Sequence, residues 1–414
     1  MDARIWLCAA VFFLLALWLL YREGLMRSPL SAAVLITTVG LSLLLRLAAF
    51  DYETLDYKDF LRHWVEFFRV NGGFAALDTP VGNYNIPYLY FLAFFSYLDI
   101  NDLHLIKLLS VFFDFVLAWS CMRLVGKFTD SPLRRGGSFC AVLLWPTVFL
   151  NGAVWGQCDS SYVALMVLGI YLALDDRPVL SMVCAALSFG FKLQAVFLLP
   201  VYAVLWMQGR FRLRHFVIFP LSYVLLVMPA VIAGRPFMDT LTLYLGQTGS
   251  IGSGLNYNSP SAFSFFQYTL PESYHELACK LGIAAAFTFM LCLLLICYVN
   301  RKSLNDRAVL AAALLFAIGI PFLLPHMHDR YFFGADMLSL VLAFVSPVCA
   351  AAALCVEFAS FLGYHAYLKM EFLLLMDRGA WALLAALLIA ACCLAFQLSG
   401  RGRAGVEKLP ENPI

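Results

Sequence analysis

Four acidic residues lie close together in a polar segment that separates an apolar run from an amphipathic one. They are Asp51, Glu53, Asp56 and Asp59. A carboxylate in such a segment can act as a general base or bind a metal ion. Carboxylates are also common at the start of a helix, where they cap free N–H groups and oppose the helix dipole. The residue types alone leave both roles open.

A second polar group, WGQCD at residues 155–159, lies where a polar tip enters an apolar run. Asp159 could cap the helix that follows it or could belong to a binding site. Trp155 and Gln157 beside it favour the rim of a pocket that is both aromatic and polar.

Lys192 and Gln194 lie in the short motif FKLQ, with apolar residues on both sides. A cation in this position costs several kcal/mol unless its ammonium reaches the membrane surface or finds a partner. Lysine binds phosphate as a point charge. We therefore expect either a side chain that snorkels to the interface or a phosphate contact.

The motif PHMHDRYFF, residues 325–333, places His326, His328, Arg330 and Tyr331 between two apolar runs. The arginine fork matches the oxygens of a phosphate. The two histidines could bind a metal ion, but no third ligand is spaced to complete a set. The motif favours hydrogen bonds to a phosphate or sugar, with a basic surface loop as the alternative. Asn258, in the Gly- and Ser-rich stretch 247–267, could bind sugar hydroxyls or form a turn.

Membrane-spanning helices must position these residues, because the chain is strongly apolar. Its 414 residues are 63% hydrophobic and 13% charged, against roughly 45–50% and 25% in soluble domains. Long continuous apolar runs exclude the alternation of a β-barrel. The sequence therefore predicts an all-α polytopic bundle of about 11–13 transmembrane helices, as a single domain over residues 1–414. The runs are 5–21, 29–50, 102–126, 137–152, 159–175, 179–207, 215–233, 276–299, 308–324, 332–364 and 379–398.

Three apolar stretches do not fit a single span. The runs 179–207 and 332–364 exceed the ~20 residues of one crossing, so each is expected to make two passes, the second broken at Pro347. The stretch 86–99 is short and is interpreted as a re-entrant or interfacial segment.

The loops differ in charge on the two sides of the predicted bundle. With thirteen spans, the basic loop residues fall on one side, which the positive-inside rule makes cytoplasmic. They are Arg22, Arg27, Lys127, Arg134, Arg135, Arg177, Arg210, Arg212, Arg214, Arg301, Lys302, Arg307, Arg401 and Arg403. The polar motifs and two long loops, 51–101 and 234–275, fall on the outer side. Residues 58–70 predict an interfacial helix, with Phe60, Leu61, Trp64, Phe67 and Phe68 on one face.

Five motifs, taken in order, resemble those of bacterial membrane mannosyltransferases related to the GPI mannosyltransferase II group, in the GT-C class. They are LDYKDFL (55–61), GNYNIPYLY (82–90), WGQCD (155–159), FKLQ (191–194) and HMHDRYFF (326–333). Such enzymes take a sugar from a polyprenyl-phosphate carrier at the outer side of the membrane, with inversion and with an acidic base.

The resemblance implies a role for each motif. Asp56 matches the position of the base, although Leu55 replaces the usual small residue before it, so Asp59 and Asp51 stay open as rivals. The HMHDR motif would face the carrier phosphate. The expected substrate-binding residues are Asp59, Tyr84, Trp155, Gln157, Asp159, Lys192, Gln194, Asn258, His326, His328, Arg330 and Tyr331.

The sequence thus predicts an enzyme that transfers mannose or another hexose from a polyprenyl-phosphate donor to a glycan or glycolipid acceptor. Its membrane would be the cell membrane, with the active site facing the periplasm or exterior. Its partners would include membrane lipid and no nucleic acid. No nucleotide-binding fingerprint occurs in the sequence, no cofactor is implied, and a divalent metal ion stays open. The alternatives are a transporter or flippase, or a polymerase or ligase, for a lipid-linked saccharide.

Overall fold

The computed structural model describes residues 1–248, 254–266 and 268–399. The chain folds into two compact units, each built from two separate segments. Unit 1 holds Met1–Ala195 and Arg214–Ser253, and unit 2 holds Val196–Leu213 and Gly254–Ile414. Part of the Gly- and Ser-rich stretch 247–267 lies outside the described residues.

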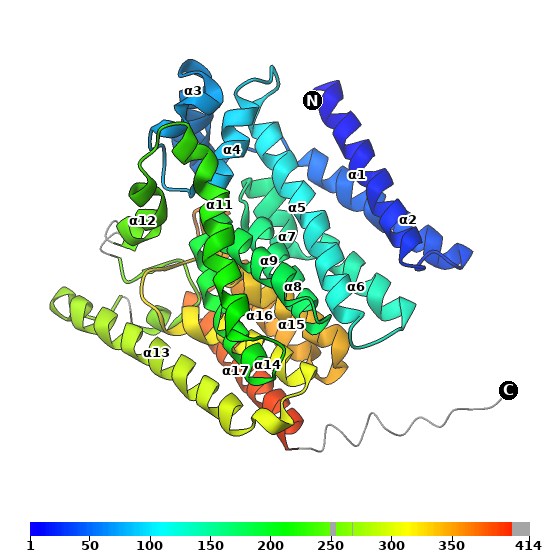
Figure 1. Ribbon diagram of the computed structural model, residues 1–414, viewed down its shortest axis with the longest axis vertical. Helices are drawn as coiled ribbons and strands as arrows, with labels where there is room; N and C mark the ends of the chain where they lie inside the picture. The colour runs from blue at the N-terminus through cyan, green and yellow to red at the C-terminus, as the bar shows by residue number, and fades with distance from the viewer. Residues whose placement is uncertain (249–253, 267, 400–414) are drawn as a thin grey trace. The chain divides into compact units, whose positions relative to one another are not determined.

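Unit 1 is helical, and its centre is α5 (Asp102–Val125), which packs against α6 (Pro132–Leu144) and α8 (Asp159–Leu174). Figure 1 shows these helices side by side. The remaining helices are α1 (Ala3–Arg22), α2 (Pro29–Ala48), α3 (Arg62–Val70), α4 (Ile86–Phe95), α7 (Pro146–Phe149), α9 (Pro178–Phe191), α11 (Ile218–Ile232) and α12 (Phe237–Thr248). Two π-helical turns, Tyr57–Leu61 and Leu150–Trp155, and the 3-10 turn Gly73–Asp78 complete it.

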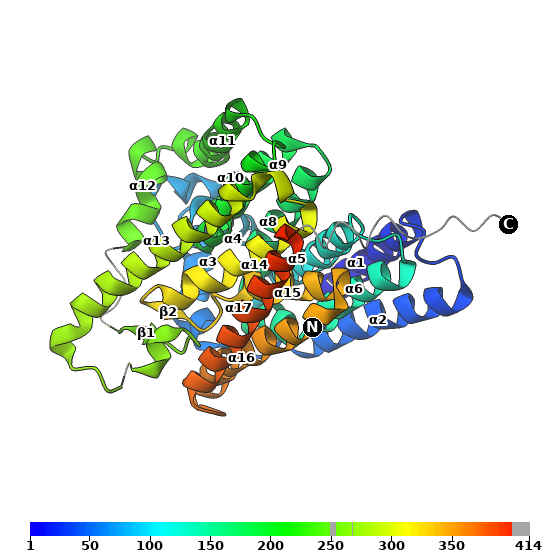
Figure 2. The same cartoon turned by 90° about the horizontal axis from the view of Figure 1, so that it is seen from below.

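Unit 2 surrounds α14 (Asp306–Leu323), which packs against α10 (Pro200–Met207), α13 (His275–Val299), α15 (Phe333–Val345) and α17 (Met376–Leu398). Helix α16 (Ala350–Lys369) packs against both α15 and α17. Two short strands, β1 (Asn256–Tyr257) and β2 (Met327–His328), pair in parallel. Figure 2 labels them next to one another.

The prediction of an all-α polytopic membrane fold is confirmed. In the described residues, eight helices are long and apolar enough to cross a membrane, or nine if the bent pair Pro132–Leu144 and Pro146–Trp155 is one span. Five shorter apolar helices accompany them. The total of 11–13 spans stays a prediction, because length and composition do not settle whether a short helix crosses.

Both long apolar runs are interrupted, and the number of passes that each makes stays a prediction. Helix α15 ends at Val345 and α16 begins at Ala350, with Pro347 in the turn between them. The run 179–207 divides into α9 and α10, separated by a 3-10 turn at Leu193–Leu198. Helix α4 has ten residues, or about 15 Å, which is half of a bilayer core. That length fits the re-entrant or interfacial interpretation.

The predicted amphipathic helix 58–70 needs one correction. Its first turn is the π-helical Tyr57–Leu61, and only from Arg62 is it α-helical. Leu61, Trp64 and Phe68 are buried, whereas Phe60 is 51% exposed. The Phe60 ring lies 6.2 Å from that of Trp64, measured between centroids, so the correction concerns the helix type of the first turn.

Charged side chains gather at one end of the unit 1 helices. Glu23, after α1, pairs with Arg123 at 2.6 Å and with Arg135. Lys127 pairs with Asp175 at 2.9 Å, after the ends of α5 and α8, and this hydrogen bond lowers the pKa of the Asp175 carboxyl. Lys127 and Arg135 belong to a predicted cytoplasmic loop, and Arg123 lies in the last turn of α5.

Candidate active site

Asp56 lies at the opposite end of these helices, in the segment between α2 and α3. The ammonium of Lys107, in α5, donates to the carbonyl oxygens of Ala49 at 2.8 Å and Tyr52 at 2.6 Å. Also in α5, His104 contacts Asp51 through Nε2 at 2.7 Å. These contacts hold the segment that follows α2 against α5. They therefore fix the position of Asp56, directly before the π-helical turn Tyr57–Leu61.

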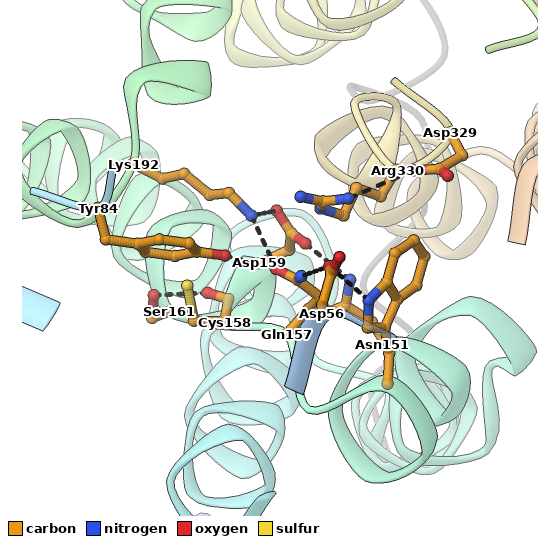
Figure 3. A network of polar contacts seen from close by, with 11 residues as sticks. Asp56, Tyr84, Asn151, Gln157, Cys158, Asp159, Ser161, Lys192, Asp329 and Arg330 are labelled. Atoms are coloured by element: carbon orange, nitrogen blue, oxygen red, sulfur yellow. Dashed lines mark hydrogen bonds and ion pairs between the residues drawn. The ribbon is translucent and has the colours of Figure 1, made fainter. Parts of the chain in front are cut away.

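Two side-chain donors orient the Asp56 carboxylate, as Figure 3 shows. Its Oδ2 accepts from Nε1 of Trp155 at 2.8 Å and from Nε2 of Gln157 at 2.6 Å. Trp155 and Gln157 are buried, whereas Asp56 is only partly so. Thr54 donates to the carbonyl oxygen of Trp155 at 3.2 Å. The carboxylate is thus oriented by fixed groups and still reachable, which is the geometry that a general base needs.

The neighbouring backbone explains how Trp155 and Gln157 reach Asp56. Trp155 ends the π-helical turn Leu150–Trp155, and Gly156 follows with φ +80°, a left-handed conformation that glycine adopts without strain. The backbone therefore changes direction at Gly156, and the side chains of Trp155 and Gln157 both reach Asp56. The π turn Tyr57–Leu61 starts directly after Asp56. Such turns are frequent at functional sites.

Gln157 links Asp56 to a buried ion pair. Its Oε1 accepts from the Tyr84 hydroxyl at 2.7 Å and from the Lys192 ammonium at 3.5 Å. Lys192 also pairs with Asp159 at 2.6 Å, and the other oxygen of Asp159 accepts from Asn151 at 2.7 Å. Lys192 is 7% exposed and Asp159 0%. Residues from four separate motifs thus form one network.

This network gives the Lys192 ammonium a partner inside unit 1, because it forms an ion pair with Asp159. The ammonium is therefore held by a carboxylate, whether or not it also lies near the interface. The cluster is rich in hydrogen-bonding groups, which can bind hydroxyl groups. The phosphate contact of Lys192 stays a prediction.

Aromatic rings line one side of the network. Tyr84 lies 5.5 Å from Trp64 and 4.7 Å from Tyr88, measured between ring centroids. The Lys192 ammonium lies 5.7 Å from the Tyr84 ring centroid. Burial raises the pKa of the Tyr57 phenol, so this neighbour of Asp56 stays neutral near pH 7.

The network lies at the ends of short helices. Helix α8 has 16 residues and α9 has 14, which correspond to about 24 Å and 21 Å. Both are shorter than the ~30 Å bilayer core. Asp159 begins α8 and Lys192 follows α9, so both polar groups lie at helix ends.

The rivals of Asp56 have different surroundings. Asp59 is exposed and, within the described residues, makes no hydrogen bond to the Asp56 network. Asp51 pairs with His104. Gln194 lies in the 3-10 turn that follows Lys192, and its buried amide oxygen has no hydrogen-bond partner among the described residues.

Unit 2 contains Asn258 and the HMHDRYFF motif, and several of these residues contact one another. The ring of His328 stacks on that of Tyr257, with centroids 4.7 Å apart, and lies 5.2 Å from the ring of Tyr331. Asn258 forms a bridge with the His328 backbone, and its φ of +55° is left-handed. Arg330 lies 3.4 Å from its neighbour Asp329.

His326 is held within unit 2 by its own contacts. Its Nδ1 is 2.7 Å from the carbonyl oxygen of Gly254, and its Nε2 is 3.5 Å from the Cys279 sulfur. Its backbone N–H donates to the carbonyl oxygen of Leu255 at 2.8 Å. Both ring nitrogens are thus engaged, so His326 positions β2 beside β1.

Sequence reasoning missed two sets of residues that hold the site. Asn151 contacts Asp159, and Lys107 holds the segment before Asp56. Beneath them, Arg46 pairs with Asp114 at 3.0 Å, and Ser160 donates to Asp114 at 2.5 Å. Each of the five is a polar residue inside an apolar run, and that signal could have identified them.

The structure leaves metal binding open. Within the described ranges, no group of three or more His, Cys, Asp or Glu side chains is placed to hold a metal ion. A divalent metal ion is therefore neither supported nor tested.

One family model matches the chain, over residues 99–208, and its description is alpha-(1->6)-mannopyranosyltransferase, N-terminal domain. The matched range contains Trp155, Gln157, Asp159 and Lys192, and it excludes Asp56. No curated protein matches the chain. The chain is a multi-pass membrane protein, and the match supports a mannosyltransferase, an enzyme that uses a mannosyl donor and a glycan acceptor.

Proposed function

We propose that this protein is an inverting mannosyltransferase of the GT-C class, related to the GPI mannosyltransferase II group, that uses a polyprenyl-phosphate-linked mannose. An acceptor hydroxyl attacks the anomeric carbon and its proton passes to Asp56. The bond from that carbon to the phosphate oxygen breaks, and the carrier leaves as polyprenyl phosphate. A single displacement of this kind needs no nucleophile on the enzyme.

The observation that carries the proposal is the orientation of Asp56. Two donors, from Trp155 and Gln157, contact the same carboxylate oxygen. A positioned base accelerates proton transfer by roughly 10²–10⁴-fold. Asp59, one turn further on, is exposed and makes no such contacts within the described residues. Of the rival carboxylates, Asp56 therefore has the surroundings of a base.

The departing phosphate needs positive charge. Lys192 has three N–H groups and uses one for Asp159 at 2.6 Å and another, weakly, for Gln157 at 3.5 Å. We assign its remaining N–H to a phosphate oxygen, with the ion pair to Asp159 setting its direction. The resemblance also implies that Arg330, in unit 2, binds phosphate, since its planar fork fits two phosphate oxygens.

The depth of the network supports a donor that enters from the membrane. The outer ends of α8 and α9 stop short of a full crossing, so the network is level with the end of the hydrocarbon layer. A polyprenyl chain would lie in that layer with its phosphate and sugar at this level. We place this end at the outer face of the cell membrane, since the basic loops lie at the other end.

The deciding experiment compares Asp56→Asn with Asp59→Asn in purified protein reconstituted in nanodiscs. The substrates are polyprenyl-phosphate-[³H]mannose and a panel of glycan and glycolipid acceptors. We expect Asp56→Asn to lose at least about 10²-fold in turnover while binding the donor as wild type does. Asp59→Asn should keep near-normal turnover.

Two other outcomes would change the assignment. Loss of turnover in Asp59→Asn, with Asp56→Asn active, would move the base to the exposed carboxylate. In sealed proteoliposomes, movement of the intact donor across the bilayer without transfer of mannose would instead favour a transporter or flippase.

A further inference from the structure

Arg235 is a buried guanidinium whose partner is missing from the described part of the chain. It is 4% exposed, and its Nε and Nη1 groups are buried with no hydrogen-bond acceptor among the described residues. It lies between α11 and α12 in unit 1, outside the Asp56 network. Neither the motifs nor the proposed reaction uses it.

A charge in this position calls for an anion. Arginine stays protonated in proteins, so Arg235 cannot escape the cost of burial by losing its proton. Asp239 and the Tyr90 phenol are near enough to act on it electrostatically, but Nε and Nη1 of Arg235 donate to neither in the described residues, and the Tyr90 hydroxyl donates instead to the carbonyl oxygen of Leu226. Water can satisfy N–H groups, but it does not neutralise the charge.

The backbone around Arg235 provides a second feature that favours an anion. Helix α12 begins two residues later and has 12 residues, so its positive dipole end lies close to Arg235 in the chain. Gly234 has a φ of +120°, and a side chain there would approach the Asp78 Cβ at 3.4 Å. The chain therefore turns sharply and brings Arg235 in beside the start of α12.

Arg235 lies at the start of α12, and the contact between α12 and α9 lies further along that helix. The Tyr244 hydroxyl, seven residues after the first residue of α12, donates to the carbonyl oxygen of Phe189 at 2.8 Å. Seven helical residues correspond to about 10 Å along the axis. Among the described residues, no hydrogen bond or ion pair joins Arg235 to Asp56, Gln157 or Lys192. We therefore assign its anion to a second group, separate from the phosphate that leaves.

Apolar residues beside Arg235 indicate what carries that anion. Ile232 is 80% exposed and Met238 is 62% exposed, and α11 belongs to a helix long and apolar enough to span a membrane. Exposed apolar side chains at the end of such a helix face lipid chains. We propose that Arg235 binds the phosphodiester of an anionic lipid. This site stands independently of the proposed reaction.

The test uses the full chain, purified and delipidated in detergent. The probes are phosphatidylglycerol, phosphatidylcholine and inorganic phosphate, read by native mass spectrometry and by the thermal midpoint. Arg235→Met should bind phosphatidylglycerol at least about tenfold more weakly, since charged hydrogen bonds are lost. Arg235→Lys should fall between it and wild type. The control is Arg177→Gln, an exposed residue at the other end of α9, and it should bind as wild type does.

A second readout separates a ligand site from a structural role. Without lipid, Arg235→Met should raise the thermal midpoint, because a buried unpaired charge is removed. The added lipid should then stabilise wild type and not this variant. A lower midpoint in Arg235→Met, or equal lipid binding by all variants, would overturn the proposal. Protection by inorganic phosphate equal to that by phosphatidylglycerol would overturn the assignment to a lipid.

Discussion

The ion pair between Lys192 and Asp159 predicts strong coupling between two substitutions. The ammonium and the carboxylate are 2.6 Å apart, with side-chain exposures of 9% and 0%. Removal of one partner leaves the other charge buried without its counter-ion, which costs about 3–5 kcal/mol. We therefore expect Lys192→Met and Asp159→Asn each to lower the free energy of unfolding by about that amount.

The double variant should be more stable than the two single changes predict. With both charges gone, no unpaired ion is left, so the double change should cost no more than either single one. The coupling energy from the cycle should therefore reach several kcal/mol, whereas independent residues add to within about 0.5 kcal/mol. Chemical denaturation in detergent, followed by near-ultraviolet circular dichroism, measures all four proteins.

Turnover of the same four proteins tests whether the pair also serves the reaction. If Lys192 donates to the phosphate, the double variant should fold and still lose turnover, with weaker donor binding. A double variant with wild-type turnover would refute the phosphate contact and leave the pair a structural role. Additive stability changes would refute the ion pair itself as an energetic unit.

Three further changes test the rest of unit 1. Asp59→Cys and Arg177→Cys should label from opposite sides of an oriented membrane with an impermeant thiol reagent, above the background of the unsubstituted protein; labelling of both from one side would contradict the proposed orientation. Gly156→Ala should lower turnover more than stability, because φ +80° costs an alanine roughly 1–2 kcal/mol and its relief moves the next residue; unchanged turnover would argue against the role of this turn. Arg46→Met should destabilise by about 3–5 kcal/mol, since Asp114 is left buried and unpaired; a thermal midpoint equal to wild type would contradict this.

Much of the candidate site can be predicted from the sequence, because the residue types themselves indicate the chemistry. A carboxylate before an amphipathic segment, and a polar tip entering an apolar run, identify Asp56 and WGQCD without any contact. The order of apolar runs identifies helices, and Pro347 identifies a break. These signals are local, so a single pass along the chain can detect them.

The remaining features depend on contacts between residues far apart in the chain. Nothing in the spacing of Lys192 and Asp159 predicts that they pair. The π turns Tyr57–Leu61 and Leu150–Trp155 depart from the 3.6-residue period, so a periodic pattern does not predict them. Periodicity assumes a regular backbone, and it fails where the backbone of the site departs from one.

Buried cations in unit 1 are informative only when their partners are known. Lys107 donates to two carbonyl oxygens that follow α2, where the helix dipole is negative. Arg46 faces Asp114, and Lys192 faces Asp159. Each of these three charges is balanced by unit 1 itself, so each can be explained by folding alone. Arg235 has no such balance within the described residues, and a protein that retains an unbalanced buried charge gives up stability for it. That loss is recovered when an anion binds, which is why Arg235, more than the paired Lys192, is the cation from which a separate ligand can be inferred.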